Sequence, residues 1–232
     1  MSAIATVVLA ATSWNSIVST YVDADHRVAY ERLKSEPRLE LYISALTAPF
    51  PPPGTLERKA TLINAYNAIV VRWITVHYPV ESVWRTKRPF REARHRVDGR
   101  LRSLDDMETE LRGLGDPRIH AALVCAARSC PPLRREAYEA SKLDAQLDAN
   151  MRQWLADAAL NSVDASGASV SGVFNWYATD FGDLPVFLAK HGFGPIKGKI
   201  HFKEYHWGLN DQGGRGEGYG GWRFYLDYSR NR

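Results

Sequence analysis

The sequence predicts a helix-rich α+β fold, built as a single domain with a small, mostly antiparallel sheet. Apolar residues recur at helical spacing along most of the 232-residue chain, which is the pattern of amphipathic helices packed on a core. Only three short segments look like strands, at residues 95–101, 119–125 and 200–209. A small sheet beside a larger helical body follows from these two observations.

The N-terminal third is predicted to be helical. Residues 13–46 predict a helix, a turn and a second helix, and the first has an apolar face formed by Trp14, Ile17, Val18 and Tyr21. Prolines and a glycine over 49–54 then predict a loop. Residues 56–78 carry a long apolar stripe at helical period, and Pro79 limits this helix to Tyr78 or earlier.

The elements after the long helix differ in type. Residues 95–101 predict a hairpin, because the Asp98-Gly99 pair favours a two-residue turn. Ser103 and Asp106 predict a capping box that begins a short helix. The apolar run Ile119 to Cys125 predicts the central strand. Further helices are expected from Ser141 with Asp144, over 173–181 and over 183–191, followed by a strand over 200–209.

Composition divides the chain into three parts. Residues 1–12 form a lead segment, residues 13–210 a single globular domain, and residues 211–232 a glycine-rich loop with a C-terminal tail. The apolar run Ala3 to Ala11 lacks the basic start of a secretory signal, so a cytoplasmic location is favoured over export. No apolar run reaches the ~20 residues of a membrane span. The aromatic tail is expected to dock as an edge strand.

The net charge is +4, and basic residues concentrate between Arg85 and Arg102. Such a cluster attracts phosphate or nucleic acid. No nucleic-acid-binding motif accompanies it, so the sequence favours a solvated basic hairpin and disfavours a nucleic-acid partner. Two cysteines supply neither a disulfide framework nor a four-ligand zinc site, and no cofactor is expected. A small molecule or a peptide is the class of partner left open.

The segment from Asp116 to Arg134 is the first candidate for chemistry, because it holds both cysteines, a histidine and several arginines. Cys130 precedes two prolines, which cannot continue a strand ladder, so its thiol is expected at an accessible turn. A nearby base activates a thiol, and the nearest imidazole in sequence belongs to His120. Three main alternatives stay open: a Cys130–His120 nucleophile, a Cys125–Cys130 disulfide or redox pair, and two core cysteines beside a hydrogen-bonded histidine. A metal site from His120, Glu108 and cysteine is a fourth and minor one, because the ligand spacing fits no standard pattern.

The other candidate side chains would support that centre. Glu108 would orient the imidazole, as the third member of a Cys-His-acid arrangement. Asn64 and Asn67 lie on one face of the helix over 56–78, where they either tie it to a loop or orient a catalytic group. Ser129 is a further oxyanion or supporting donor. An anionic group of a substrate would contact Arg128 and Arg134.

Several motifs occur together in a fixed order. They are Leu62 to Ala68, His77 to Val80, Leu104 to Glu108, Asp116 to Leu133, Trp176 to Gly182 and Tyr205 to Asn210. In these motifs the chain resembles the uncharacterised family catalogued as domain of unknown function 547, from about Trp14 to Asn210. The resemblance implies little about activity, because the family itself has no assigned function.

The chain departs from this family's pattern at two positions. Family members usually carry Glu-His in the short helix, whereas this chain has Glu108 followed by Thr109. The late motif usually reads Tyr-Asp-Trp-Ser, whereas His206 and Gly208 stand here in place of the aspartate and the serine. If either family position is catalytic, the departures imply an altered or inactive member; the alternative is that His206 has taken over the role of the missing imidazole.

Two functions of different class follow from these observations. One is a thiol-dependent hydrolase or acyl transferase, with Cys130 as nucleophile, His120 as base and Glu108 as its orienter. The other is a non-catalytic binding or scaffold domain, in which the cysteine, histidine and asparagine side chains form a structural network. Convergence of Cys130, His120 and Glu108 in one open pocket would favour the enzyme.

Overall fold

The structure is a computed structural model that describes residues 13–231. The predicted lead segment, with its apolar run Ala3 to Ala11, lies outside the described residues. The described part confirms the helix-rich α+β fold class, with a two-stranded antiparallel sheet and a three-stranded sheet of order β3-β4-β5. Within residues 13–231, every helix is too short or too polar to cross a membrane.

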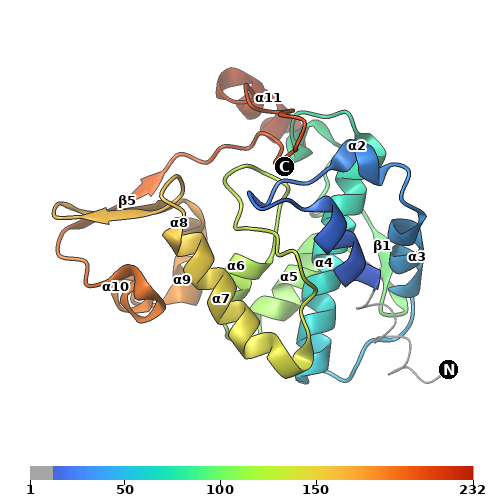
Figure 1. The fold of residues 1–232 in the computed structure, drawn as a ribbon, viewed down its shortest axis with the longest axis horizontal. Coiled ribbons are helices and arrows are strands. Elements are labelled where there is room, and N and C mark those ends of the chain that lie inside the picture. The colour runs from blue at the N-terminus through green and yellow to red at the C-terminus, as the bar shows by residue number, and fades with distance from the viewer. Residues whose placement is uncertain (1–12, 232) are drawn as a thin grey trace.

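The long helix α4, Leu56–His77, is the centre of one half of the molecule (Figure 1). Thr55 caps its N-terminus by accepting a hydrogen bond from the Arg58 amide, and the chain turns to an extended conformation at Tyr78, before Pro79. The predicted helix is therefore confirmed. Around it lie a helix over residues 13–21, α2 (Tyr30–Leu33), α3 (Pro37–Ala45) and the 3-10 helix η1 (Val83–Arg85).

The hairpin and the capped helix after it are also confirmed. Strand β1 (His95–Val97) pairs with β2 (Arg100–Arg102) across a turn in which Asp98 and Gly99 have φ of 54° and 72°. Two consecutive left-handed residues are what a type I′ turn requires. The helix α5 (Leu104–Arg112) begins with the capping box between Ser103 and Asp106. Its carboxylates neutralise the basic hairpin, in the pairs Arg94–Asp106 and Arg102–Glu110.

The predicted central strand from Ile119 to Cys125 is wrong. Residues Ile119–Ala122 form the short helix α6, which packs against α7 (Leu143–Ala156). Asp116 begins this turn, because its side chain accepts from the Arg118 amide and its carbonyl accepts from the Ile119 amide. The run is apolar because it is buried on all sides, and periodicity alone does not separate a buried strand from a buried helix.

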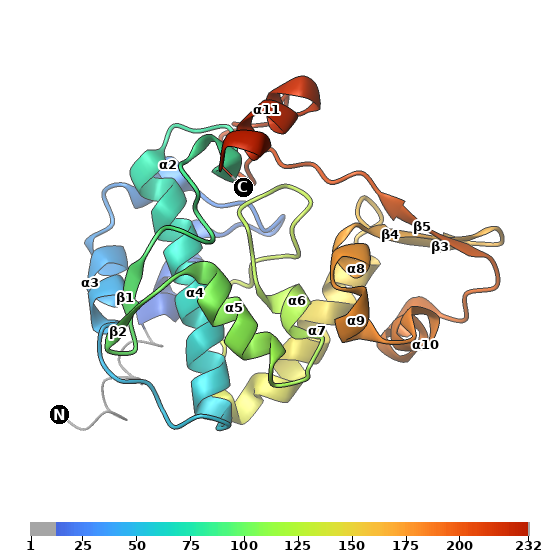
Figure 2. The ribbon, with the colours of Figure 1, turned by 180° about the vertical axis from the view of Figure 1, so that it is seen from behind.

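The second half of the molecule holds the three-stranded sheet, opposite α3 (Figures 1 and 2). Strand β4 (Gly167–Ser171) pairs antiparallel with β3 (Ser162–Asp164) and parallel with β5 (Lys199–Lys203). The sequence prediction missed β3 and β4, which consist largely of Gly, Ala, Ser and Val. The helix α7 joins the two halves: Leu143 and Leu147 lie in the main core, and Met151 and Trp154 in the second core.

The remaining helices differ from prediction in detail. The helix over 173–181 is broken at Tyr177 into α8 (Val173–Trp176) and α9 (Ala178–Phe181). Ser141 does not cap α7, because the 3-10 helix η2 (Ala140–Lys142) precedes it. The predicted helix over 183–191 is α10 (Leu184–Leu188), followed by η3 (Ala189–Phe193). The tail forms α11 (Gly221–Asn231), so the predicted edge strand is wrong.

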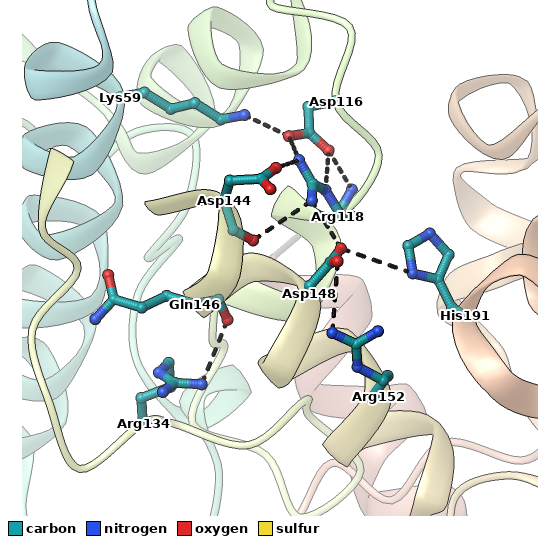
Figure 3. Close-up of polar contacts among 9 residues, drawn as sticks. All are labelled: Lys59, Asp116, Arg118, Arg134, Asp144, Gln146, Asp148, Arg152 and His191. Carbon is teal, nitrogen blue, oxygen red and sulfur yellow. Dashed lines mark hydrogen bonds and ion pairs between the residues drawn. The ribbon is translucent and has the colours of Figure 1, made fainter. Parts of the chain in front are cut away.

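A charge network fastens α4, α6, α7 and η3 to one another (Figure 3). Asp116 contacts both Lys59 Nζ at 2.6 Å and Arg118 Nη2 at 2.9 Å. Arg118 continues to Asp148 at 2.7 Å, and Asp148 lies 4.0 Å from His191 Nδ1. Burial by itself would raise the pKa of Asp116, but the hydrogen bonds from Arg118 and Lys59 outweigh it and hold the pKa below the usual value.

The network predicts how stability depends on the charge of Asp116. Asp116→Asn keeps the oxygen that accepts from the Arg118 amide and removes the charge, so it should cost about 2 kcal/mol of unfolding free energy at pH 7. A depressed pKa gives stability that is present above the unfolded-state pKa of about 3.9 and is lost as the pH falls. Urea unfolding at pH 7 and pH 3 should show a smaller difference from wild type at pH 3.

The matched control is Asp144→Asn, because Asp144 also contacts Arg118 but its side chain is 87% exposed. An exposed pair contributes little, so this variant should change stability by less than about 0.5 kcal/mol. Equal effects of Asp116→Asn at the two pH values would contradict the charge argument.

Candidate functional site

A pocket of about 920 Å³ lies between the two cores. Its walls come from α4, α5, α6, the loop 123–131, α8, residues 204–207 and α11. Glycine-rich chain over 212–221 leads into α11, whose Phe224 and Tyr228 close one side of the pocket. Segments from across the sequence therefore meet at one concave surface, which is the usual setting of a small-molecule site.

Glu108, His120 and Cys130 all line this pocket. Glu108 comes from α5, His120 from the single turn of α6, and Cys130 from the loop just before Pro131. The pocket thus brings together the three residues that the sequence put forward as a catalytic centre.

The His120 imidazole is hydrogen-bonded to Asp180, which is not among the site residues predicted from the sequence. Its Nε2 lies 2.8 Å from Asp180 Oδ2, and Asp180 in turn accepts two hydrogen bonds from Arg112, at 2.6 and 2.9 Å. The hydrogen bonds from Arg112 lower the pKa of Asp180 to about 2, so this carboxylate is charged at neutral pH. With a proton on Nε2 directed at Asp180, the Nδ1 of the neutral ring is the basic nitrogen.

His120 is kept neutral by its surroundings. Burial lowers its pKa below the usual value, and the hydrogen bond to Asp180 opposes the shift only in part. The ring packs at 4.1 Å from the ring of Tyr177 and at 5.2 Å from that of Phe181. A neutral, oriented imidazole at the edge of a pocket is able to accept a proton near pH 7.

Glu108 has the opposite environment to Asp180. Burial raises its pKa, against a hydrogen bond with the Tyr177 hydroxyl that lowers it. Its expected role as orienter of His120 is wrong, because Asp180 occupies that role. Glu108 is instead a partly buried carboxyl that retains a proton to higher pH than an exposed one, which suits an acid or a counter-charge in the pocket.

The cysteines are joined to each other. The structure forms a Cys125–Cys130 disulfide, so neither is a free thiol in this state and the nucleophile predicted at Cys130 is absent from it. The side chain is also buried, because Cys130 packs in the main core. Cys130 Sγ accepts a hydrogen bond of 2.8 Å from the Cys125 amide, and the Tyr205 hydroxyl donates to Cys125 Sγ at 3.2 Å.

Asn64 and Asn67 serve the fold. Each amide side chain makes two hydrogen bonds to backbone: Asn64 to both the N–H and the C=O of Tyr138, and Asn67 to the Ala122 C=O and the Val124 N–H, at 2.8 to 3.0 Å. The sequence left two roles open for these asparagines. In the structure they connect α4 to neighbouring loops through these hydrogen bonds. Neither side chain lines the pocket formed by the described residues.

Arg128, Ser129 and Arg134 also lie outside the pocket walls that the described residues form. Arg128 pairs with Glu217 at 2.9 Å, and Arg134 pairs with Glu136. The Ser129 hydroxyl accepts from the His206 amide at 2.8 Å, so it is not directed at a substrate. The roles expected for these residues in anion binding or oxyanion stabilisation therefore stay predictions, which no contact in this pocket supports.

The structure shows the surroundings of His206 and Thr109, the residues at which the chain departs from the family pattern. His206 Nδ1 accepts from the Gly208 amide at 3.1 Å, and its Nε2 lies 3.1 Å from the Glu217 carbonyl. An aspartate at this position accepts the amide two residues on in the same way, so His206 keeps the turn, and its side chain also lines the pocket. Thr109 is exposed on α5, so a histidine there would not enlarge the pocket's set of acids and bases.

The pocket walls are strongly aromatic, which sequence reasoning missed. Eleven of its 26 lining residues are Phe, Trp or Tyr, against 11% of the whole chain. Trp207 lies nearly parallel to Trp176 and to Phe224, at centroid distances of 5.7 and 5.8 Å. Clusters of aromatic letters at 174–181, 205–207 and 222–228 were the available signal, but only the fold shows that they converge.

Substitution of Asn67 tests its structural role. Asn67→Leu preserves the approximate size of the side chain but leaves the Ala122 carbonyl and the Val124 amide without their partner, which should cost ~1–3 kcal/mol of unfolding free energy. Chemical denaturation measures this loss. The control is Asn175→Leu, at an exposed position of α8, where a change within about 0.5 kcal/mol is expected. An equally small effect at Asn67 would show that the two hydrogen bonds contribute nothing.

Among known proteins, one family model matches part of this chain, whereas no curated protein and no solved structure matches it. The matched range includes Glu108, His120 and both cysteines, but not Asp180 or the aromatic residues after it. Residues 54–155 match the family described as "Protein of unknown function, DUF547", and the chain therefore resembles this uncharacterised family.

Proposed function

We propose that the pocket is the active site of a thiol-dependent hydrolase or acyl transferase, which works with Cys130 in its reduced form. The single observation that carries this proposal is that Cys130 lines one open pocket together with His120, whose imidazole is hydrogen-bonded to Asp180. A nucleophile, a neutral base and an acid that orients the base are the parts that covalent acyl transfer needs.

The first step is reduction of the Cys125–Cys130 disulfide. A dithiol reductant gives two electrons and two protons to the disulfide and is itself oxidised to a disulfide, which leaves two thiols in the pocket. The Cys125 amide, which donates to Cys130 Sγ at 2.8 Å, favours the thiolate over the thiol at that sulfur. The Tyr205 hydroxyl supports Cys125 Sγ in the same way but at the longer distance of 3.2 Å, so Cys130, with the shorter contact, is taken as the nucleophile.

The chemical steps then follow from the surroundings. His120 takes the thiol proton of Cys130, and the thiolate adds to the acyl carbon of a substrate. The protonated imidazole returns this proton to the leaving group as the carbon–heteroatom bond breaks, which leaves a thioester. Water or a second acceptor, deprotonated by His120, then releases the acyl group and restores the thiol. Asp180 stabilises the imidazolium throughout, and Arg112 holds Asp180 in place.

The second candidate is a non-catalytic binding or scaffold domain. The observation that favours it is the bond between the two cysteines, together with the amide side chains that fasten the loop around them. In that case the disulfide is permanent, the pocket binds a ligand without changing it, and His120 with Asp180 is part of the core.

The cysteines distinguish the two candidates. After reduction with dithiothreitol, iodoacetamide at pH 7 should label Cys130 about tenfold faster than Cys125, because its thiolate is the more populated. Cys125→Ser removes the possibility of the disulfide, so this variant should hydrolyse p-nitrophenyl acetate without added reductant, whereas Cys130→Ser should be inactive under all conditions. Equal, slow labelling of both thiols in the folded protein would favour the scaffold.

The histidine is tested separately. His120→Gln should slow the labelling of Cys130 by about tenfold, because the thiol loses its base. Burial lowers the pKa of His120, so the labelling rate of wild type should fall with decreasing pH only below the ordinary histidine pKa of about 6.5. The control is His201→Gln, at an exposed position of β5, which should leave both rates unchanged. A rate independent of position 120 would exclude His120 as the base.

A further inference from the structure

The pocket is acidic although the protein is basic. Its walls hold the carboxyl groups of Asp105, Glu108 and Glu204, and a single fixed cation, Arg91. Arg91 lies 3.7 Å from Asp105, so these two groups compensate each other. The chain as a whole carries a net charge of +4. An acidic cavity in a basic protein concentrates cationic ligands and repels anionic ones.

Two of these carboxyl groups have no cation of their own. Within the part of the chain that the structure describes, neither Glu108 nor Glu204 has an ion-pair partner within 4.0 Å. Glu204 is exposed at the mouth of the pocket, and Glu108 is partly buried inside it. An acidic group held in apolar surroundings without a counter-charge is destabilised, and a ligand cation would relieve that cost.

The aromatic walls offer the other half of a cation site. Tyr205 packs on Trp176 at 4.8 Å and on Trp207 at 4.5 Å, with interplanar angles of 51° and 48°. Trp176 and Trp207 are stacked on each other at an interplanar angle of 13°, so the inclined Tyr205 ring and the stacked indoles form an open corner. Trp176 is 49% exposed although it packs on both other rings, so a large area of its indole still faces water. The negative face of an aromatic ring attracts an organic cation, and tryptophan does so most strongly.

We propose that this pocket binds an organic ammonium ion, with Trp176 and Tyr205 as the aromatic walls and Glu108 as the counter-charge. The inference deepens the proposed function, since it takes the same pocket as the site of chemistry and describes the substrate as one that carries an ammonium group. The binding itself does not depend on the state of the cysteines.

The test compares two ligands of one shape. Choline has a positively charged nitrogen at the position where 3,3-dimethylbutan-1-ol has a carbon. The two ligands therefore match in size and in apolar contacts. Isothermal titration calorimetry on the folded protein, without reductant, should give an affinity for choline at least about tenfold higher than for the alcohol. Equal affinities, or binding of neither ligand, would overturn the inference.

Variants locate the site. Glu108→Gln keeps the shape of the side chain and should lower the choline affinity by about tenfold, while leaving that of the alcohol unchanged. Trp176→Leu should weaken choline by a similar factor, and its half-exposed position allows the substitution without loss of the fold. The controls are Glu57→Gln and Trp222→Leu, both exposed and outside the pocket walls, and neither should change the affinity. Loss of binding in the controls would place the ligand elsewhere.

The outcomes for the two proposals are separate. Choline binding without esterase activity in the reduced protein would retain the ammonium site and exclude the thiol enzyme. Activity of the reduced protein with no preference for choline over the alcohol would retain the enzyme and exclude the ammonium site.

Discussion

Four amide side chains bond the backbone of the chain between α6 and α7, which also pairs with the backbone of residues 206–210. Asn67 and Asn64 of α4 hold the backbone at residues 122–124 and at 138. From α7, Asn150 donates to the carbonyls of residues 121 and 132, and Gln146 bonds the backbone at 137 and 139. All four side chains are buried. A buried loop with neither sheet nor helix to satisfy it requires partners of this kind.

The candidate site is positioned by the same scaffold. Cys130 lies on this segment, between the positions that Asn67 and Asn150 hold, and His120 lies in α6, next to the residue 121 carbonyl that Asn150 also holds. Ala126, between the two cysteines, has a φ of 63°, a left-handed conformation that is uncommon for alanine. Such a conformation persists only where surrounding structure over-determines it. A regular strand would direct alternate side chains to opposite faces, whereas an irregular segment fastened on both sides brings an imidazole and a sulfur to one pocket.

Most features that depend on interactions between neighbouring residues were predicted correctly from the sequence, whereas features that depend on distant residues were not. The helix from Leu56 and the capping box at Ser103 were predictable because their signals lie within a few residues. The strand expected from Ile119 to Cys125 was not formed, because its amides close a helical turn and its other backbone groups bond side chains of α4 and α7. Asp180 escaped selection for the same reason, since its partners Arg112 and His120 are 68 and 60 residues away. The aromatic wall likewise exists only after folding.

Two carboxyl groups near His120 show how the environment separates their roles. Both carboxylate oxygens of Asp180 accept hydrogen bonds from Arg112, so this carboxylate stays ionised and fixes the orientation of the imidazole. Glu108 is one turn before Arg112 on α5, yet its carboxyl meets the Tyr177 hydroxyl and no cation, so burial raises its pKa. Acids whose pKa values are driven apart in this way are suited to different tasks in one site. The single arginine therefore decides which acid serves the base and which one faces the ligand.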